Sequence, residues 1–143
     1  MQIEPVNGAA EVKLFHDYMV KVAGKVAIIG TRNFVINVDE YVAPSEITEV
    51  ITGGARGVDT SAMDFATKHG IPLTVFKPKY KLYGGGAPFI RNREIVDRAE
   101  HVIAFWDRES KGTKYTVNYA LQQKKPVTII YPETLNQDET KTC

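Results

Sequence analysis

The chain has 143 residues, of which 43% are hydrophobic and 24% charged, and its formal net charge is +1. This length suits one domain with a substantial core, and the balanced charge excludes the strong overall field of a dedicated nucleic-acid binder. The single cysteine, Cys143, excludes a disulfide within the chain, and no apolar run approaches the ~20 residues of a membrane span. Since the N-terminus also lacks the core of a signal peptide, we expect a cytoplasmic protein that does not enter membranes.

The first part of the chain, residues 1–24, is predicted to be a helical extension. Apolar residues within the segment 9–23 recur at the spacing of one helix face: Leu14, Phe15, Tyr18, Met19 and Val22. Gly24 follows at a position where glycine commonly ends a helix. We expect this helix to pack on the domain or to serve a subunit interface, and the sequence does not decide between the two.

Five short apolar runs are predicted to be parallel strands: 25–30, 49–52, 71–76, 101–105 and 127–130. Helices are predicted between them, except that the crossover 33–49 has room only for a short helix around 38–42. This alternation predicts an α/β fold, a single-domain, Rossmann-like, doubly wound parallel sheet of about five strands with an added N-terminal helix. The sheet domain is expected to cover residues 25–131, followed by a polar tail, 132–143.

The most distinctive stretch is TGGARGVD, residues 52–59, between a predicted strand and a predicted helix. Its glycines allow a sharp turn and a close backbone approach, and the next helix points its free N–H groups and positive dipole end at that turn. The guanidinium of Arg56 suits a phosphate. We interpret the stretch as an anion-binding loop, with a tight turn that holds no ligand as the alternative. Its candidate ligand-binding residues are Gly53, Gly54, Ala55, Arg56, Gly57 and Asp59.

Three further loops carry ligand-binding candidates at the same predicted edge, because the carboxyl ends of parallel strands lie together. The candidates are Gly30, Thr31 and Arg32; Arg91, Asn92 and Arg93; and Lys111, Gly112 and Thr113. Arg91 and Arg93 do not share a helix face, so one is expected to point at the site and the other to form a salt bridge. No metal site is predicted.

Residues 77–89, KPKYKLYGGGAPF, form a long basic and aromatic segment with three consecutive glycines. Such glycines indicate mobility or close approach to another group. A flexible lid and a disordered loop are both compatible with this pattern. Trp106 follows a predicted strand and is expected to belong to the core, with stacking on a base as the alternative.

The segments VAIIGTR, ITGGARGVDTSA, GIPLTVFKP, PFIRNREIVDRAEHVIAFWD and SKGTKYTVNYA resemble, in order and spacing, the YspA/YpsA-related branch of the SLOG superfamily. The resemblance covers most of residues 25–130. It implies a Rossmann-like fold that binds nucleotides or nucleotide-derived ligands at these loops. Distant relatives are DprA, with motifs similar to GGARGVDT and RNRE, and the Lonely-guy phosphoribohydrolases. The latter need an acidic residue two positions after the second Gly-Thr, where this chain has Lys114 and Tyr115.

Three functions are therefore compatible with the sequence. The leading one is binding of a nucleotide or nucleotide-derived small molecule at the glycine-rich loops. An N-glycosidic hydrolase of nucleotides is the alternative, and its carboxylate candidates are Asp59, Glu94 and Asp107. A DprA-like protein that binds single-stranded DNA through the basic aromatic segment is a second alternative, which the net charge of +1 does not favour. A homo-oligomer is compatible with a small sheet of this type, and the sequence does not decide the oligomeric state.

Overall fold

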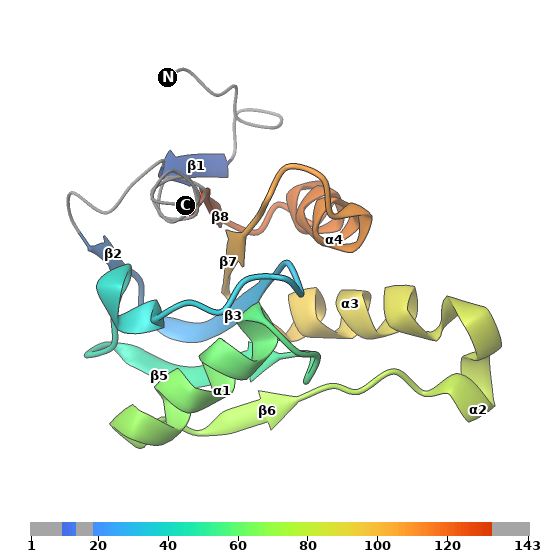
Figure 1. Ribbon diagram of the computed structural model, residues 1–143, viewed down its shortest axis with the longest axis horizontal. Coiled ribbons are helices and arrows are strands. Elements are labelled where there is room, and N and C mark those ends of the chain that lie inside the picture. The colour runs from blue at the N-terminus through green and yellow to red at the C-terminus, as the bar shows by residue number, and fades with distance from the viewer. Residues whose placement is uncertain (1–9, 14–18, 133–143) are drawn as a thin grey trace, which may run out of the picture.

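The computed structural model describes residues 10–13 and 19–132. Its main feature is a six-stranded, all-parallel sheet in the order β1-β8-β7-β3-β5-β6 (Figure 1). The bounds of these strands are β1 Ala10–Lys13, β3 Gly24–Gly30, β5 Ile47–Thr52, β6 Leu73–Val75, β7 His101–Phe105 and β8 Val127–Ile130. Because all six strands run the same way, their carboxyl ends lie at one edge of the sheet.

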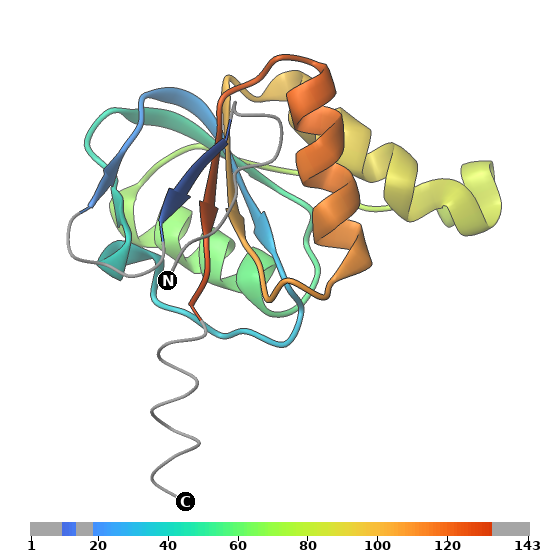
Figure 2. The same cartoon turned by 90° about the horizontal axis from the view of Figure 1, so that it is seen from above.

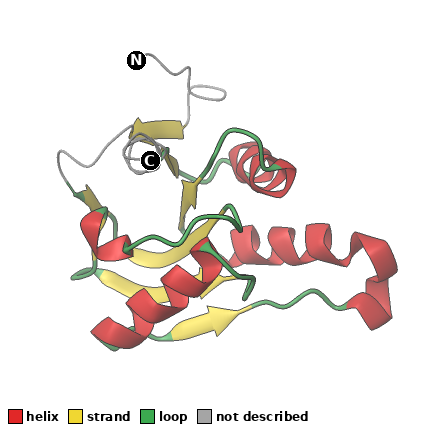
Figure 3. Cartoon of the chain, viewed as in Figure 1, coloured by secondary structure: helices red, strands yellow, loops and turns green. Residues whose placement is uncertain are grey.

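Helices link the strands (Figure 3). They are α1 Val58–His69, α2 Tyr80–Tyr83, α3 Ala87–Arg98 and α4 Lys111–Gln122, with 3-10 turns η2 Val38–Glu40 and η3 Gly84–Gly86. A small separate pair of parallel strands joins β2, Val20–Lys21, to β4, Val42–Ala43.

The sheet is buried on both faces, as continuous apolar strands predict. Within β3, Val26 and Ile28 contribute to the core under α1, whereas Ala27 and Ile29 contribute to the core under α3 and α4. This alternation follows from the two-residue period of a strand. Figure 2 shows α3 and α4 on the side of the sheet opposite to α1. The fold is therefore the doubly wound Rossmann-like arrangement that the sequence predicts, and all five predicted strands are present.

The prediction of an N-terminal helix is wrong wherever the structure describes that segment. Ala10–Lys13 forms β1, which pairs in parallel with β8, and Val20–Lys21 forms β2. The edge of β8 offers unpaired backbone groups, and an added strand satisfies them. Residues 14–18 of the predicted helix lie outside the described residues, as does the predicted tail except for Pro132.

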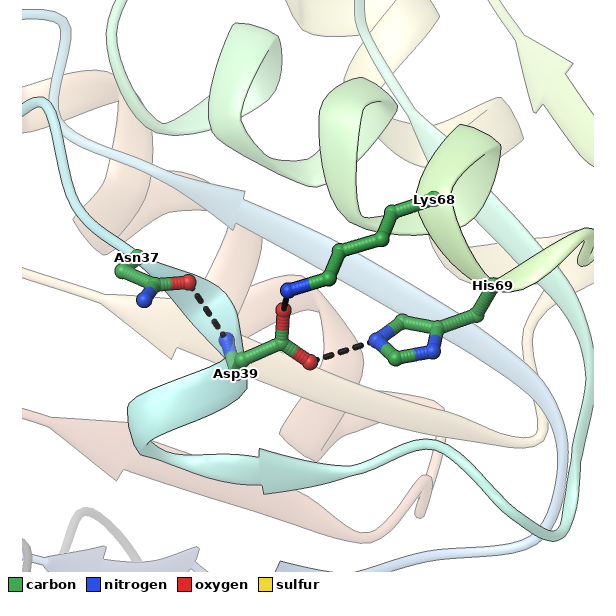
Figure 4. A network of polar contacts seen from close by, with 4 residues as sticks. All are labelled: Asn37, Asp39, Lys68 and His69. Atoms are coloured by element: carbon green, nitrogen blue, oxygen red, sulfur yellow. Dashed lines mark hydrogen bonds and ion pairs between the residues drawn. The ribbon is translucent and has the colours of Figure 1, made fainter.

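The short helix predicted around 38–42 is present as the 3-10 turn η2, followed directly by β4. Asp39 of η2 joins this crossover to the last turn of α1 (Figure 4). Its carboxylate accepts hydrogen bonds from Lys68 at 2.9 Å and from His69 at 2.5 Å, and the side chain of Asn37 caps η2 by accepting from the N–H of Asp39. The first crossover is thus held on the same face as α1.

Candidate functional site

A cleft of about 460 Å³ opens at the carboxyl edge of the sheet. The loops after β3, β5 and β7 and one face of α3 form its walls. Eleven residues that the sequence analysis singled out line it: Gly30, Thr31, Arg32, Ala55, Arg56, Asp59, Arg91, Asn92, Asp107, Gly112 and Thr113. The convergence of separate loops that the sequence predicts is therefore present.

The loop between β5 and α1 is folded around Asp59 and Arg91, both of which are less than 9% exposed. The Asp59 carboxylate accepts a hydrogen bond from the N–H of Ala55 at 3.1 Å. Arg91, which comes from α3, donates to the carbonyl of Gly53 at 2.7 Å and to the Asn92 side chain at 2.8 Å. A side chain on Gly53 would approach Arg91 and Asp59 within 3 Å, so Gly53 leaves room for both.

Burial changes the protonation equilibria of this pair. Burial raises the pKa of Asp59 above the ordinary value of 3.8, although the hydrogen bond from the N–H of Ala55 and the charge of Arg91 both lower it. Burial also lowers the pKa of Arg91, although the negative charge of Asp59 raises it. A carboxyl group with a raised pKa in a cleft is a common feature of functional sites.

Gly57 shapes the beginning of α1. Its φ is 78°, and a Cβ there would lie 2.3 Å from the carbonyl oxygen of Arg32. Only glycine fits such a position without strain. Gly57 thus brings the loop after β3 directly against the start of α1, with the N–H of Val58 donating to the carbonyl of Thr31 at 3.3 Å.

The N-terminus of α4 forms another wall of the cleft. The hydroxyl of Ser110 caps the helix by accepting from the N–H of Thr113 at 3.3 Å. One oxygen of Asp107 accepts from the N–H groups of Glu109 and Ser110 at 2.8 and 2.7 Å, which fixes the turn before the helix. A Cβ on Gly112 would meet no atom within 4 Å. The first turn of α4 therefore leaves open space over backbone N–H groups that lack an intrahelical acceptor.

Thr31 has a structural role as well as a place in the cleft lining. It is 3% exposed, and its hydroxyl accepts from the N–H of Asp107 at 3.2 Å, which joins the loop after β3 to the loop after β7. Arg32 and Arg56, by contrast, are exposed at the cleft. Their guanidinium groups are thus available to an anion.

Some candidates lie outside the cleft lining: Gly53, Gly54, Gly57, Arg93, Glu94 and Lys111. The three glycines among them allow the loop between β5 and α1 to pack closely, since a Cβ at any of them would lie within 3 Å of another atom. Arg93 is exposed and donates to the hydroxyl of Tyr115 of α4 at 2.7 Å, where the sequence predicts a salt bridge. Arg91 is therefore the arginine that lines the cleft. Glu94 lies 3.5 Å from the ammonium group of Lys79.

Other lining residues were missed by the sequence analysis: Ile29, Asn33, Pro88, Phe89, Ile95, Glu109, Ser110 and Thr116. Helical spacing could have found some of them. Pro88 and Ile95 lie three residues before and four after Arg91, and Thr116 lies four after Gly112. Trp106, predicted to belong to the core, is half-buried and packs against the buried cluster under α4. Its indole N–H donates to the carbonyl of Ser110 at 3.0 Å.

The fold and the cleft define a doubly wound α/β protein with an open polar site at the carboxyl edge of its sheet. Comparison with protein-family models, curated proteins and solved structures finds no match to the chain. Among residues 19–132, no cluster of three or more His, Cys, Asp or Glu side chains could hold a metal ion. In the part of the chain that the structure describes, no helix is long and apolar enough to cross a membrane.

Proposed function

We propose that the cleft binds a nucleotide or nucleotide-derived ligand, with its phosphate at the first turn of α4. The observation that carries this proposal is the open space over Gly112, where a Cβ would meet no atom within 4 Å. The N–H groups at a helix N-terminus and the positive end of the helix dipole favour an anion. Arg32, Arg56 and Arg91 line the same cleft and supply positive charge.

The remaining lining suits the other parts of such a ligand. Phe89 is 45% exposed at the cleft and packs edge-to-face on Tyr115, with ring centroids 4.9 Å apart. An exposed aromatic face can stack on a base. Asp59 and Asp107 line the cleft, and carboxylate side chains can accept hydrogen bonds from ribose hydroxyls.

Thermal unfolding with adenosine 5′-monophosphate (AMP) as the probe tests this function. Ligand at ~100 times its Kd adds about 2.7 kcal/mol of stability, which for a domain of this size raises Tm by roughly 5–10 °C. Gly112→Leu places a side chain over the first turn of α4, where a Cβ meets no atom within 4 Å, and should abolish the shift while the variant stays folded. Gln122→Leu, at the exposed end of the same helix, is the matched control and should keep the shift. Equal Kd values for wild type and Gly112→Leu would refute the proposed site.

A hydrolytic activity is the second candidate, and the buried carboxyl group of Asp59 favours it. Its raised pKa suits a group that donates a proton to a departing base. Incubation with AMP followed by chromatography would detect free adenine and ribose 5-phosphate. This activity should be lost in Asp59→Asn, whereas Glu94→Gln, outside the cleft lining, should retain it. Recovery of intact AMP after binding would leave the protein as a binder alone.

A further inference from the structure

An arm, residues 77–86, connects β6 to α3 and packs little against the rest of the chain. Figure 1 shows its helix α2 at the N-terminal end of α3, beyond the carboxyl end of β6. No residue of the arm is buried. Tyr80, Leu82 and Tyr83 are 55%, 68% and 41% exposed. Apolar side chains that stay in water add no hydrophobic free energy to folding. Their exposure therefore favours a second state of the protein in which these three side chains are covered.

Both ends of the arm are anchored beside the cleft. At one end, the N–H of Phe76 donates to the carbonyl of Thr52 at 2.9 Å. At the other end, Ala87 is fully buried, and the next two residues, Pro88 and Phe89, line the cleft. The side chain of Lys77 lies beside Gly54, within 4 Å of where a Cβ would be. Both ends of the arm are therefore held by residues next to the cleft.

Gly84–Gly86 supplies the flexibility that a movement of the arm needs. A Cβ on any of the three would meet no atom within 4 Å, and of the three only Gly84 has a positive φ, 61°. Neither space nor backbone conformation thus requires glycine at Gly85 or Gly86. Glycine there has the largest conformational freedom of any residue, at the boundary between an exposed arm and the buried start of α3.

Charge gives the arm a reason to move toward a bound anion. The cleft is lined by three arginines and three carboxylates, Arg32, Arg56 and Arg91 with Asp59, Asp107 and Glu109. A phosphorylated ligand adds negative charge that this balanced set does not offset. The arm carries Lys77, Lys79 and Lys81. Their attraction to the ligand rises as the arm approaches and water is excluded.

We propose that the arm is a lid, which turns about Gly84–Gly86 and closes over the cleft when an anionic ligand binds. Closure covers Tyr80, Leu82 and Tyr83 against the ligand and Phe89 and brings the lysines toward the phosphate. This inference rests on the proposed function, because closure needs a ligand in the cleft. It adds a conformational step that would slow ligand release.

Limited trypsin digestion of the full chain, with and without saturating AMP, tests the lid. Cleavage after Lys79 and Lys81 is expected without ligand, and AMP should slow it at least tenfold. Amide hydrogen exchange of residues 80–86 should fall in parallel. Gly85→Ala with Gly86→Ala fits the present backbone, so Tm without ligand should not fall, whereas AMP affinity should drop about tenfold. Leu82→Ser should also weaken AMP binding, whereas Val35→Ser, at a side chain that is 90% exposed and does not line the cleft, should not.

The outcomes separate the lid from the site. If AMP raises Tm but leaves the arm equally open to trypsin, the lid is refuted and the proposed function stands. Unchanged AMP affinity in the double alanine variant would also refute the proposal that the arm turns about Gly84–Gly86. If AMP does not bind at all, with Tm and trypsin cleavage both unchanged, the proposed function fails and the lid fails with it.

Discussion

Two buried carboxylates, Glu49 and Asp59, each lie near an arginine of α3, and the two pairs differ in how the arginine is used. Arg98 donates to both oxygens of Glu49, at 2.6 and 3.0 Å, and the hydroxyl of Thr74 donates to the same carboxylate at 2.6 Å. The Arg98 hydrogen bonds hold the pKa of Glu49 below its ordinary value of 4.5, against the effect of burial. This pair ties α3 to the sheet.

At the cleft, Arg91 donates to the carbonyls of Gly53 and Phe76 and to the Asn92 side chain, and burial raises the pKa of Asp59. Arg91 and Arg98 are seven residues apart, about two helical turns, so both lie on the face of α3 toward the sheet. The comparison teaches that residue type alone does not distinguish a structural tie from the proposed binding site. What differs is that Glu49 accepts hydrogen bonds from two nitrogens of its arginine, whereas Asp59 lines the cleft.

The largest effect is expected from Arg91→Met. It leaves the Gly53 carbonyl and the Asp59 carboxylate buried without their cation, which should cost about 3 kcal/mol of unfolding free energy and lower Tm by roughly 6–12 °C. AMP binding should be lost as well. Arg98→Met is the matched control: its side chain is 44% exposed, so the loss of stability should be smaller and AMP binding should persist. If both variants lost AMP affinity equally, the proposal that Arg91 serves the cleft and Arg98 only stability would be refuted.

Glu49→Gln should have the next largest effect. Because the folded-state pKa of Glu49 is lowered, its contribution to stability is present above the ordinary value of 4.5 and is lost as pH falls through the lowered value. The variant should therefore melt several degrees lower than wild type at pH 7. This difference in Tm between wild type and variant should shrink as the pH is lowered. A gap that is constant from pH 7 to pH 3 would show that charge is not the cause.

Asp59→Asn should give the opposite pH dependence. A raised folded-state pKa means that the native protein holds this proton more tightly, so the stabilising contribution is present below the ordinary value of 3.8 and is lost as pH rises through the raised value. Relative to wild type, the variant should gain stability as pH rises from 3 to 7. Tm measured across that range checks the sign, and a relative loss toward pH 7 would contradict it.

The smallest effect is expected at Asp39, whose partner Lys68 is 64% exposed. Hydrogen bonds from Lys68 and His69 lower the pKa of Asp39 although partial burial raises it. Asp39→Asn should cost about 0.5 kcal/mol or less, because such surface pairs are screened by water and salt. Chemical denaturation at low and high salt measures this loss, which should shrink as salt is added.

Much of the fold follows from the sequence through strong local rules. Continuous apolar runs such as VAII in β3 suit strands buried on both faces, and Gly70, with φ 65°, ends α1 where the sequence predicts. The described parts of the N-terminal segment, Ala10–Lys13 and Val20–Lys21, were predicted wrongly because the apolar spacing of the segment suits a helix. Pairing of β1 with β8 instead supplies backbone hydrogen bonds from residues over a hundred positions away. Such long-range pairing leaves little trace in a local pattern.

The sequence by itself determined that glycine-marked loops would meet at one sheet edge, since parallel strands carry their carboxyl ends there. Only the tertiary structure decided which side chains face the cleft. Arg91 and Arg93 are the same residue type two positions apart, yet Arg91 is 8% exposed beside Gly53, whereas Arg93 is exposed and contacts Tyr115 of α4. Tertiary packing fixes the rotation of α3 about its axis, and that rotation decides which arginine reaches the site.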